Sequence, residues 1–328
     1  MRKIKVLVCG AGSIGTRHIS NLLNLGVDVS VWRKQKDLLD KITHDYPVHP
    51  CNELEKGIIA ANAVVISTAT DNHMSIATEA LQAGRALFIE KPISNSWSGV
   101  ENLLEIGKDI TVEIGCQLRA HPVLNTLAEI LTKKNGDLPL TYRMVMGHRL
   151  DAWRPDQDYR QSYSAHSDRG GGALFDLIHQ IDLALWFFGP VTSVTSVLSS
   201  ISDLEIVGDD VANILMTHKC GVTGHIQLDM CSPVYRCEIE VVATESVYKW
   251  SNVDGTLLSF SVAGKNIIQE LPSGFERNDL FITHMEHFLK RLDESVLPPL
   301  CSLESGVDAL KVALAARESN IKKISINL

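Results

Sequence analysis

The sequence predicts two folding regions, an α/β region at residues 1–118 and an α+β region at residues 119–328. In the first region, apolar strand patterns alternate with helical patterns, which is typical of a parallel sheet with helices on both faces. From Leu140 onward, short strand-like runs follow one another with Gly, Asp or Asn turns, which indicates a mostly antiparallel open sheet with helices on one face. The chain has 328 residues, enough for two domains of about 100–200 residues each.

In the first region, the pattern predicts strands at residues 4–9, 27–32, 63–68, 86–89 and 111–115, and helices at 14–25, 36–46, 52–60, 73–83 and 96–107. Asp71 and Asn72 are expected to cap the helix that begins at His73. In the second region, the pattern predicts strands at 141–146, 191–200, 211–218, 221–229, 237–243, 247–250 and 257–262, and helices at 173–188, 281–292 and 303–320.

A glycine turn lies between the first strand and the first helix. Gly10, Gly12 and Gly15 follow the spacing G-x-G-x-x-G, which in this strand–turn–helix context is typical of a dinucleotide-binding Rossmann domain. The first glycine allows the sharp turn, the second lets the backbone approach a pyrophosphate, and the third lets the helix pack close to the strand. The helix N-terminus at Ser13 and Ile14 offers unpaired N–H groups and a partial positive charge to the phosphates.

The end of the second strand favours a phosphorylated cofactor. In NAD-binding members of this fold, an acidic residue at this position binds the ribose 2′-hydroxyl. Here the position is occupied by Trp32, Arg33 and Lys34, with no acid. Because a guanidinium and an ammonium can pair with a 2′-phosphate, we favour NADP(H) over NAD(H), with an exposed basic loop as the alternative.

Polar residues also follow the other predicted strands of the first region. Ligands of such a sheet bind at the carboxyl ends of the strands. We therefore expect the remaining cofactor contacts at this edge, from Thr68, Asn72, His73, Glu90, Lys91 and Gln117.

Composition and charge exclude several classes of protein. The 31 basic and 39 acidic residues give a net charge of −8, which argues against nucleic-acid binding. No apolar run approaches the ~20 residues of a membrane helix, and the first apolar stretch ends at Cys9, so it is interpreted as a strand and not as a signal peptide. The seven cysteines are scattered without a C-x-x-C motif, which indicates reduced thiols in a cytoplasmic protein.

No metal site is predicted. His284 and His287, with Glu286, have a metal-like spacing, but the sequence offers no H-E-x-x-H motif and no third ligand. We therefore expect these residues to form a solvated helix face.

A resemblance to a known family rests on three motifs: the glycine turn, Ile89-Glu90-Lys91-Pro92 at a strand end, and Gly170-Gly171-Gly172 followed by His179-Gln180-Ile181-Asp182. Together they resemble the glucose–fructose oxidoreductase / inositol dehydrogenase (Gfo/Idh/MocA) family. The likeness spans the whole chain, since 68–73 looks like the family's loop after the fourth strand and 115–122 like its crossover into the second domain. It implies a nicotinamide-dependent oxidoreductase that acts on a sugar, cyclitol or related polyol, with Lys91 as the active-site lysine.

The expected chemistry agrees with this resemblance. A histidine with a pKa near ~6.5 suits the removal of a hydroxyl proton, and His179 matches the family's histidine. A lysine at a strand end can hold the substrate oxygen and stabilise developing negative charge. Many members carry an aspartate four residues before the histidine, but here that position is Phe175 and Asp176 comes one residue later. Asp176 is therefore predicted as a catalytic or orienting residue in a shifted position, with another role as the alternative. The Lys91–Pro92 bond is cis in similar proteins, and the sequence leaves it open.

A polar and aromatic stretch at residues 148–164 is the candidate substrate loop, since a loop of this length inside a domain is usually functional. Arg149, Arg154 and Arg160 can meet a carboxylate or phosphate; a covering loop with exposed charges is the alternative. The stretch is similar to family members associated with nonulosonic (sialic-acid-like) sugar pathways. The predicted substrate contacts are Lys91, Arg119, Trp153, Arg154, Tyr159, Asp176 and His179.

The leading hypothesis is thus hydride transfer between a nicotinamide and a secondary alcohol or ketone of a sugar, sugar acid or cyclitol. The alternatives are a glycosidase that oxidises its substrate transiently and a non-catalytic regulator that binds a dinucleotide. The expected partners are a small-molecule substrate and further copies of the chain, because the uncovered face of the second sheet builds homodimers or homotetramers in similar proteins.

Overall fold

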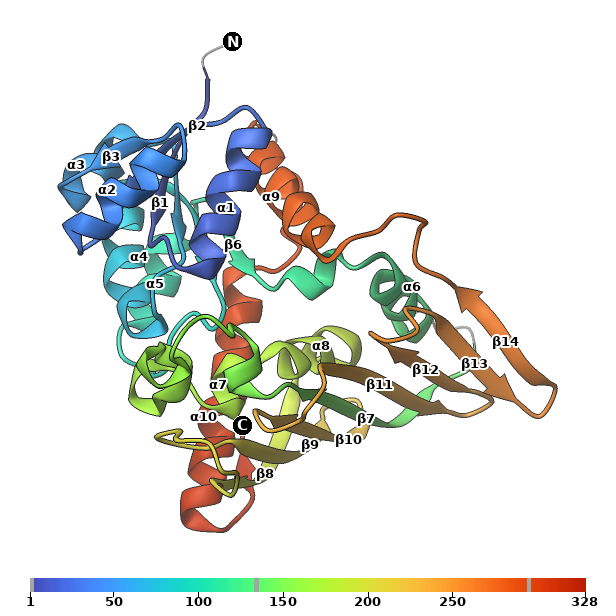
Figure 1. Cartoon of the computed structure of the whole chain (residues 1–328). Coiled ribbons are helices and arrows are strands. Elements are labelled where there is room, and N and C mark those ends of the chain that lie inside the picture. The colour runs from blue at the N-terminus through green and yellow to red at the C-terminus, as the bar shows by residue number, and fades with distance from the viewer. Residues whose placement is uncertain (1–2, 133–135, 294–295) are drawn as a thin grey trace. The chain divides into compact units, whose positions relative to one another are not determined.

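The computed structural model describes residues 3–132, 136–293 and 296–328. It divides into two compact units (Figure 1). The first unit contains the residues up to Ala120 together with Glu276–Val307, and the second contains His121–Phe275 and Asp308–Leu328.

The first unit is built on a six-stranded parallel sheet with the strand order β3-β2-β1-β4-β5-β6. The strands are β1 (Lys5–Cys9), β2 (Asp28–Trp32), β3 (His49–Cys51), β4 (Ala63–Ile66), β5 (Ala86–Glu90) and β6 (Val112–Gly115). The helices are α1 (Ser13–Asn24), α2 (Lys36–Asp45), α3 (Leu54–Ala60), α4 (His73–Gln82), α5 (Val100–Gly107) and α9 (Arg277–Asp293). This strand order confirms the predicted Rossmann fold.

The position of α9 differs from the expected division into two contiguous regions. The segment 276–307 was expected in the second region, but it belongs to the first unit. The reason is packing: Met285 and Phe288 of α9 are fully buried in the same apolar core as Phe88 of β5. In Figure 1, α9 lies beside α1.

Two local predictions in the first unit were wrong. The helix expected from Ser96 begins at Val100, because Gly99 has a left-handed φ of 81° that interrupts the helical path. Asn72 does not cap α4 with its side chain; its amide instead donates a hydrogen bond of 2.7 Å to the Asp71 carboxylate.

The second unit is built on a nine-stranded sheet with the order β14-β13-β12-β11-β7-β10-β9-β8-β15. The strands are β7 (Pro139–Gly147), β8 (Val191–Ser199), β9 (Val211–His218), β10 (Thr223–Asp229), β11 (Arg236–Ala243), β12 (Val247–Ser251), β13 (Leu257–Ser261), β14 (Gly264–Gln269) and β15 (Ile326–Asn327). β10 pairs with β7 in parallel, and the other described neighbours pair antiparallel. The expected mostly antiparallel sheet is therefore confirmed, while β14, β15 and the short β3 were not predicted.

Helices α6 (Pro122–Thr132), α7 (Ala173–Asp176), α8 (His179–Phe188) and most of α10 (Leu303–Lys322) belong to this unit. The predicted continuous helix at 173–188 is broken between α7 and α8, where Leu177 leaves the helical region with φ −98° and ψ 25°. As a result, Asp176 ends one helix and His179 begins the next. No helix within the described residues is long and apolar enough to cross a membrane.

Candidate active site

The glycine turn of the first unit has no room for a side chain at its first and third glycines. Gly10 has a φ of 96°, and a Cβ there would lie 2.8 Å from the carbonyl of Ser67. A Cβ at Gly15 would lie 2.1 Å from the carbonyl oxygen of Gly10. The Ser67 hydroxyl stabilises the turn, since it lies within hydrogen-bond distance of the carbonyl oxygens of Cys9 (3.2 Å) and Gly10 (3.0 Å). The first and third glycines are therefore required by the backbone itself.

The second glycine faces open space. A Cβ at Gly12 would meet no atom within 4 Å, and Gly12 and Ser13 are exposed. Helix α1 starts here with no acidic residue in its first turn and no side chain capping its N-terminus. The first N–H groups, at Ser13 and Ile14, thus remain available to an anion, and the turn fits the pyrophosphate of a dinucleotide.

Arg33 lies directly against this turn. Its Nη1 donates to the carbonyl oxygen of Ala11 at 3.0 Å, and its Nη2 lies 3.4 Å from Gln35 Oε1. Partial burial lowers the pKa of Arg33 from its ordinary value, but an arginine stays charged at neutral pH. The next residue, Lys34, is exposed.

His73 lies below the expected cofactor edge, where it joins two loops. The ring is buried, with Nδ1 2.9 Å from the carbonyl oxygen of Pro92 and Nε2 3.0 Å from the carbonyl oxygen of Thr68. Both ring nitrogens therefore face backbone carbonyls, and a cofactor contact of His73 stays a prediction. The hydroxyl of Thr68, by contrast, is buried and has no hydrogen-bond partner within the described residues.

Glu90, predicted as a cofactor contact, is buried at the end of β5. Its carboxylate is buried and lies 2.7 Å from Nε2 of His18. Burial opposes its ionisation, but the hydrogen bond and charge of His18 outweigh burial and hold the pKa of Glu90 below its ordinary value. A Cβ at Gly115 would lie 2.9 Å from this carboxylate, so the neighbouring strand leaves space for it. The half-buried Lys91 follows at once, and the Lys91–Pro92 peptide bond is cis.

Two further predicted residues are buried. Gln117 has 8% of its surface exposed and Arg119 has 6%. Arg119 Nη1 donates to the carbonyl oxygen of Leu300 at 3.1 Å, a contact within the first unit that sequence spacing does not show. This hydrogen bond holds Nη1 of the guanidinium, and the substrate contact of Arg119 stays a prediction.

In the second unit, a glycine run positions α7 and Asp176. A Cβ at Gly171 would lie 2.2 Å from the carbonyl oxygen of Tyr163, so the run packs directly on the end of the polar segment. The hydroxyl of Tyr163 donates to Asp176 at 3.2 Å. Asp209 accepts a 2.7 Å hydrogen bond from the N–H of Leu174 in the first turn of α7. Tyr163 and Asp209 were not predicted, because neither carries a sequence motif.

His179 begins α8 and, like Asp176, is 4% exposed. The break between α7 and α8 separates these two residues, so the spacing of an unbroken helix does not describe their relation. Phe175, at the family's aspartate position, is fully buried with its ring 4.2 Å below the guanidinium carbon of Arg317. At this position the chain therefore has a buried phenylalanine ring and no carboxylate.

The polar segment 148–164 folds into short 3₁₀ turns, η3 (Leu150–Ala152), η4 (Tyr159–Gln161) and the start of η5 (Tyr163–Ala165). Two of its three arginines are held by acids: Arg149 pairs with Asp203 at 2.9 Å and with Asp151 at 3.0 Å, and Arg160 pairs with Asp158 at 2.8 Å and with Glu205 at 3.1 Å. The expectation that Arg149 and Arg160 meet a substrate anion is therefore corrected: they fasten the segment.

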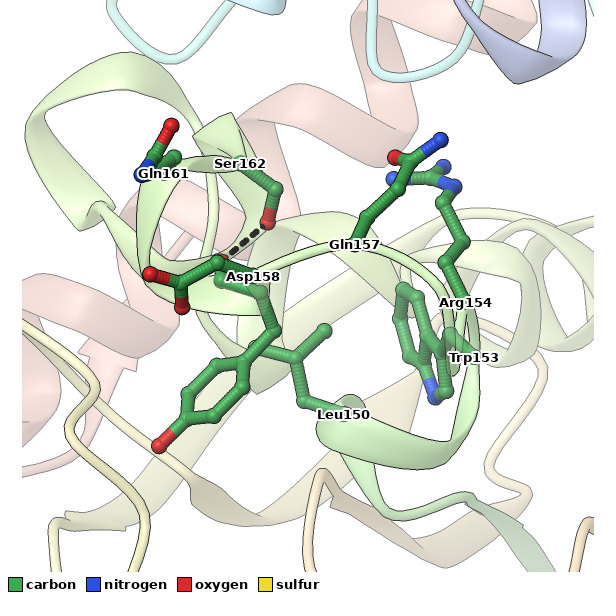
Figure 2. A pocket seen from close by; sticks show the side chains of 8 residues that line it. Leu150, Trp153, Arg154, Gln157, Asp158, Gln161 and Ser162 are labelled. Carbon is green, nitrogen blue, oxygen red and sulfur yellow. Dashed lines mark hydrogen bonds between the residues drawn. The ribbon is translucent and has the colours of Figure 1, made fainter.

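The same segment lines an open pocket with a volume of about 380 Å³ (Figure 2). Its lining residues all come from this segment: Leu150, Trp153, Arg154, Gln157, Asp158, Tyr159, Gln161 and Ser162. The predicted substrate residues Trp153, Arg154 and Tyr159 are thus brought together, within the size range of about 300–1,000 Å³ for small-molecule sites.

The same division into a glycine-turn unit and a sheet unit is found in known protein families. Residues 4–114 match the family model described as "Oxidoreductase family, NAD-binding Rossmann fold". Residues 141–249 match the "GFO/IDH/MocA C-terminal domain". The chain belongs to the Gfo/Idh/MocA oxidoreductase family. The expectations of a family member, an oxidoreductase and a domain that binds NAD-type dinucleotides are confirmed.

Relatives of this family match along the whole chain. A myo-inositol 2-dehydrogenase of Thermotoga maritima is 26% identical and aligns over 99% of this chain and 98% of its own length. A scyllo-inositol 2-dehydrogenase (NAD(+)) of Bacillus subtilis is 23% identical over 97% of this chain and 94% of its own. A solved levoglucosan dehydrogenase in complex with NADH superposes with a TM-score of 0.86 at 17% identity and covers 99% of both chains, which supports the fold.

Proposed function

We propose that this oxidoreductase transfers a hydride between a nicotinamide cofactor and a secondary alcohol or ketone of a sugar, sugar acid or cyclitol. The observation that carries the proposal is the full-length match to inositol dehydrogenases, in a chain that has Lys91 after a strand end and His179 after a glycine run. Both residues lie next to rigid elements, Lys91 after the fixed end of β5 and His179 at the start of α8.

In the oxidising direction, Lys91 holds the substrate oxygen and stabilises the negative charge that develops on it. His179 accepts the hydroxyl proton. Asp176, fixed by the hydroxyl of Tyr163, orients polar groups beside the substrate. The bound nicotinamide supplies the hydride-accepting carbon. In the reducing direction, the histidine donates the proton and the lysine holds the carbonyl oxygen.

We also propose a preference for NADP(H) over NAD(H). The support is Arg33, whose guanidinium lies on the glycine turn at a position where NAD-binding members of this fold carry an acid, with Lys34 exposed next to it. Both cations are suited to a 2′-phosphate.

Cofactor binding is tested by mixing the protein with NADPH or NADH and following the fluorescence of the reduced nicotinamide. We expect tighter binding of NADPH, and Arg33→Asp should weaken NADPH more than NADH. Equal losses for both would contradict the 2′-phosphate assignment, and enhancement with neither would contradict cofactor binding altogether.

Turnover is tested with a panel of polyols, inositols and sugar acids in the presence of NADP⁺ or NAD⁺. Nicotinamide reduction by at least one of them is expected, and Lys91→Ala should reduce kcat by about 10² or more. Full turnover in Lys91→Ala would refute the role of the lysine. Cleavage of a glycosidic bond without net nicotinamide reduction would favour a glycosidase, and binding without either reaction would favour a regulator.

A further inference from the structure

The pocket of segment 148–164 is lined by one cation, Arg154, and one carboxylate, Asp158. Arg149 and Arg160 are each held between two carboxylates. Within the described part of the chain, Arg154 has no ion-pair partner, although it lines the cavity and is half-buried. A guanidinium pairs with carboxylates and phosphates through two parallel hydrogen bonds, so an arginine without an ion-pair partner in a pocket is suited to an anionic ligand.

A tight turn fixes Arg154 at the cavity wall. The N–H of Gln157 donates to the carbonyl oxygen of Arg154 at 3.0 Å, and Pro155 occupies the second position of this turn, where its fixed φ is favourable. Arg154 and Gln157 both line the pocket, and in the view of Figure 2 their side chains extend toward the same side of it. A guanidinium and an amide in one lining offer several N–H donors.

The nearest acid of the lining, Asp158, does not neutralise this cation. Both of its carboxylate oxygens accept hydrogen bonds from Arg160, at 2.8 and 3.2 Å. In Figure 2, the Asp158 carboxylate and the Arg154 guanidinium lie on opposite sides of the cavity. The Asp158 carboxylate is therefore held by Arg160, and Arg154 lines the pocket without pairing with it.

The other walls suit a hydroxylated ring. Leu150 is buried at the floor, and the indole of Trp153 is held in place because its Nε1 donates to the carbonyl oxygen of His148 at 2.9 Å. The Trp153 ring also stacks on the ring of His148 with centroids 6.3 Å apart. A fixed aromatic face beside amide and hydroxyl groups can contact C–H and O–H groups of a sugar at once.

We propose that this cavity is a substrate subsite for an anionic group, a carboxylate or a phosphate ester, on a polyhydroxylated substrate, and that Arg154 binds that group. The proposal rests on the proposed function, since it names the substrate class of the same oxidoreductase. According to this proposal, the protein binds sugar acids or sugar phosphates more tightly than neutral sugars and cyclitols.

The test is calorimetric titration of the full chain, in the presence of NADPH, with D-glucuronate, D-glucose 6-phosphate and D-glucose as probes. We expect at least one charged probe to bind about tenfold or more tightly than glucose, as a charge-assisted hydrogen bond predicts. Arg154→Gln should remove this preference and leave glucose binding within about twofold. Arg154→Lys should keep part of it, because the charge remains while the fork of donors is lost.

The matched control is Lys219→Gln, which removes an exposed cation from the turn after β9 in the same unit and should leave all three affinities unchanged. An unchanged thermal transition in Arg154→Gln shows that the variant is folded. The probe whose affinity falls more in this variant identifies the bound group as carboxylate or phosphate. If neither charged probe binds better than glucose, or if Arg154→Gln keeps the preference, the subsite proposal is overturned.

These outcomes are distinguishable from failure of the proposed function. Charge-selective binding that depends on Arg154, without nicotinamide reduction by any polyol, would support the subsite and contradict hydride transfer. Turnover of neutral polyols with no effect of charge would support hydride transfer and overturn the subsite.

Discussion

At the residue scale, the three glycines of the turn after β1 have different physical roles. A Cβ at Gly12 enters open space, whereas a Cβ at Gly15 overlaps the backbone carbonyl of Gly10. We predict that Gly12→Ala keeps the free energy of unfolding within about 0.5 kcal/mol but weakens dinucleotide binding by tenfold or more, because the methyl group occupies the approach of the pyrophosphate.

Gly15→Ala is the contrasting variant. Its methyl group has nowhere to go without moving the backbone, so it should lower the free energy of unfolding by about 2 kcal/mol or more as well as cofactor affinity. Urea denaturation and nicotinamide fluorescence of the two variants provide the measurement. Cofactor binding by Gly12→Ala as tight as that of the wild type would contradict the approach of the pyrophosphate to Gly12.

His121 gives a second prediction at this scale. The ring is buried against Trp250 and Phe275, with centroids 5.1 and 5.6 Å apart, and burial lowers the pKa of His121 to about 4. Its Nδ1 accepts from the N–H of Leu124 at 3.4 Å, which requires the neutral ring. Since the folded pKa lies below the unfolded value, the neutral ring stabilises the fold fully above pH ~6.5, and this contribution is lost as the pH falls toward 4.

We therefore expect the wild-type chain to lose about 2 kcal/mol more stability than His121→Asn between pH 7 and pH 5. Asparagine keeps a polar group at the start of α6 but cannot titrate. Denaturant unfolding of both proteins at the two pH values measures the difference. Parallel losses would mean that His121 does not carry this pH dependence.

The sequence predicts the roles of residues that local backbone geometry determines, and it misses the roles that depend on contacts between distant residues. Gly10 and Gly15 are set by local backbone geometry, which a motif records. The burial of Glu90 against His18, and of Arg119 against Leu300, depends on contacts between residues 72 and 181 positions apart. Such contacts leave no periodic signal in the sequence.

At the element scale, α9 is tied to the Rossmann sheet by a buried charge cluster. Glu113 of β6 is fully buried, and its carboxylate lies 3.1 Å from Nε2 of His284 and 2.8 Å from Nη1 of Arg291. The N–H of Cys301 donates to the same carboxylate at 2.9 Å. The expectation of a solvated face at His284 is therefore wrong: this histidine is 1% exposed and forms part of the cluster.

We predict that Glu113→Gln lowers the free energy of unfolding by about 3 kcal/mol, because Arg291 then remains charged and buried without a counterion. Burial opposes ionisation of Glu113, but the hydrogen bond and charge of His284 outweigh it and lower the pKa. The carboxylate therefore stabilises the fold above its unfolded pKa of ~4.3, and this stability is lost as the pH falls through the lower folded value.

Urea denaturation at neutral and acidic pH measures both effects. The control is Glu105→Gln, which removes an exposed pair with Lys108 and should change the free energy of unfolding by less than about 0.5 kcal/mol. Equal effects of the two substitutions would mean that the cluster adds nothing to the attachment of α9.

Element positions were predictable where the apolar pattern is periodic and bounded, as in β9, whose predicted and observed bounds agree at Val211–His218. The break between α7 and α8 could not be predicted, because the sequence from Ala173 to Phe188 is apolar enough for one continuous helix. Asp209 fixes α7 from outside, through its hydrogen bond to Leu174, and a pattern within the helix cannot show this.

At the scale of the whole molecule, the division of the chain was predictable only in part. The change of pattern near residue 120 is visible in the sequence, since strand–helix alternation ends there. The return of 276–307 to the first unit is not visible, because an amphipathic helix carries no record of which sheet it covers.

One face of the nine-stranded sheet carries exposed apolar and charged side chains. Buried and exposed residues alternate along β9, so the side chains at odd positions point away from the helices. Exposed apolar residues on this face include Val197, Leu215 and Ile267, which are 57%, 54% and 61% exposed. Between them, Glu240 lies opposite Arg143 on one side and Lys249 on the other. A face with exposed apolar groups and alternating charges is self-complementary, as a two-fold contact between identical chains requires.

We therefore propose that this face joins two or four copies of the chain and predict that Leu215→Arg shifts the molecule toward the mass of one chain in light scattering after gel filtration. In the assembled molecule the arginine would be buried without a partner on this face, which costs several kcal/mol per contact. Ile59→Arg, which alters an apolar residue of the first unit that is 57% exposed, should keep the wild-type mass. A Leu215→Arg protein that assembles as the wild type does would place the contact elsewhere, and a wild-type chain that is monomeric at micromolar concentration would refute the proposed assembly.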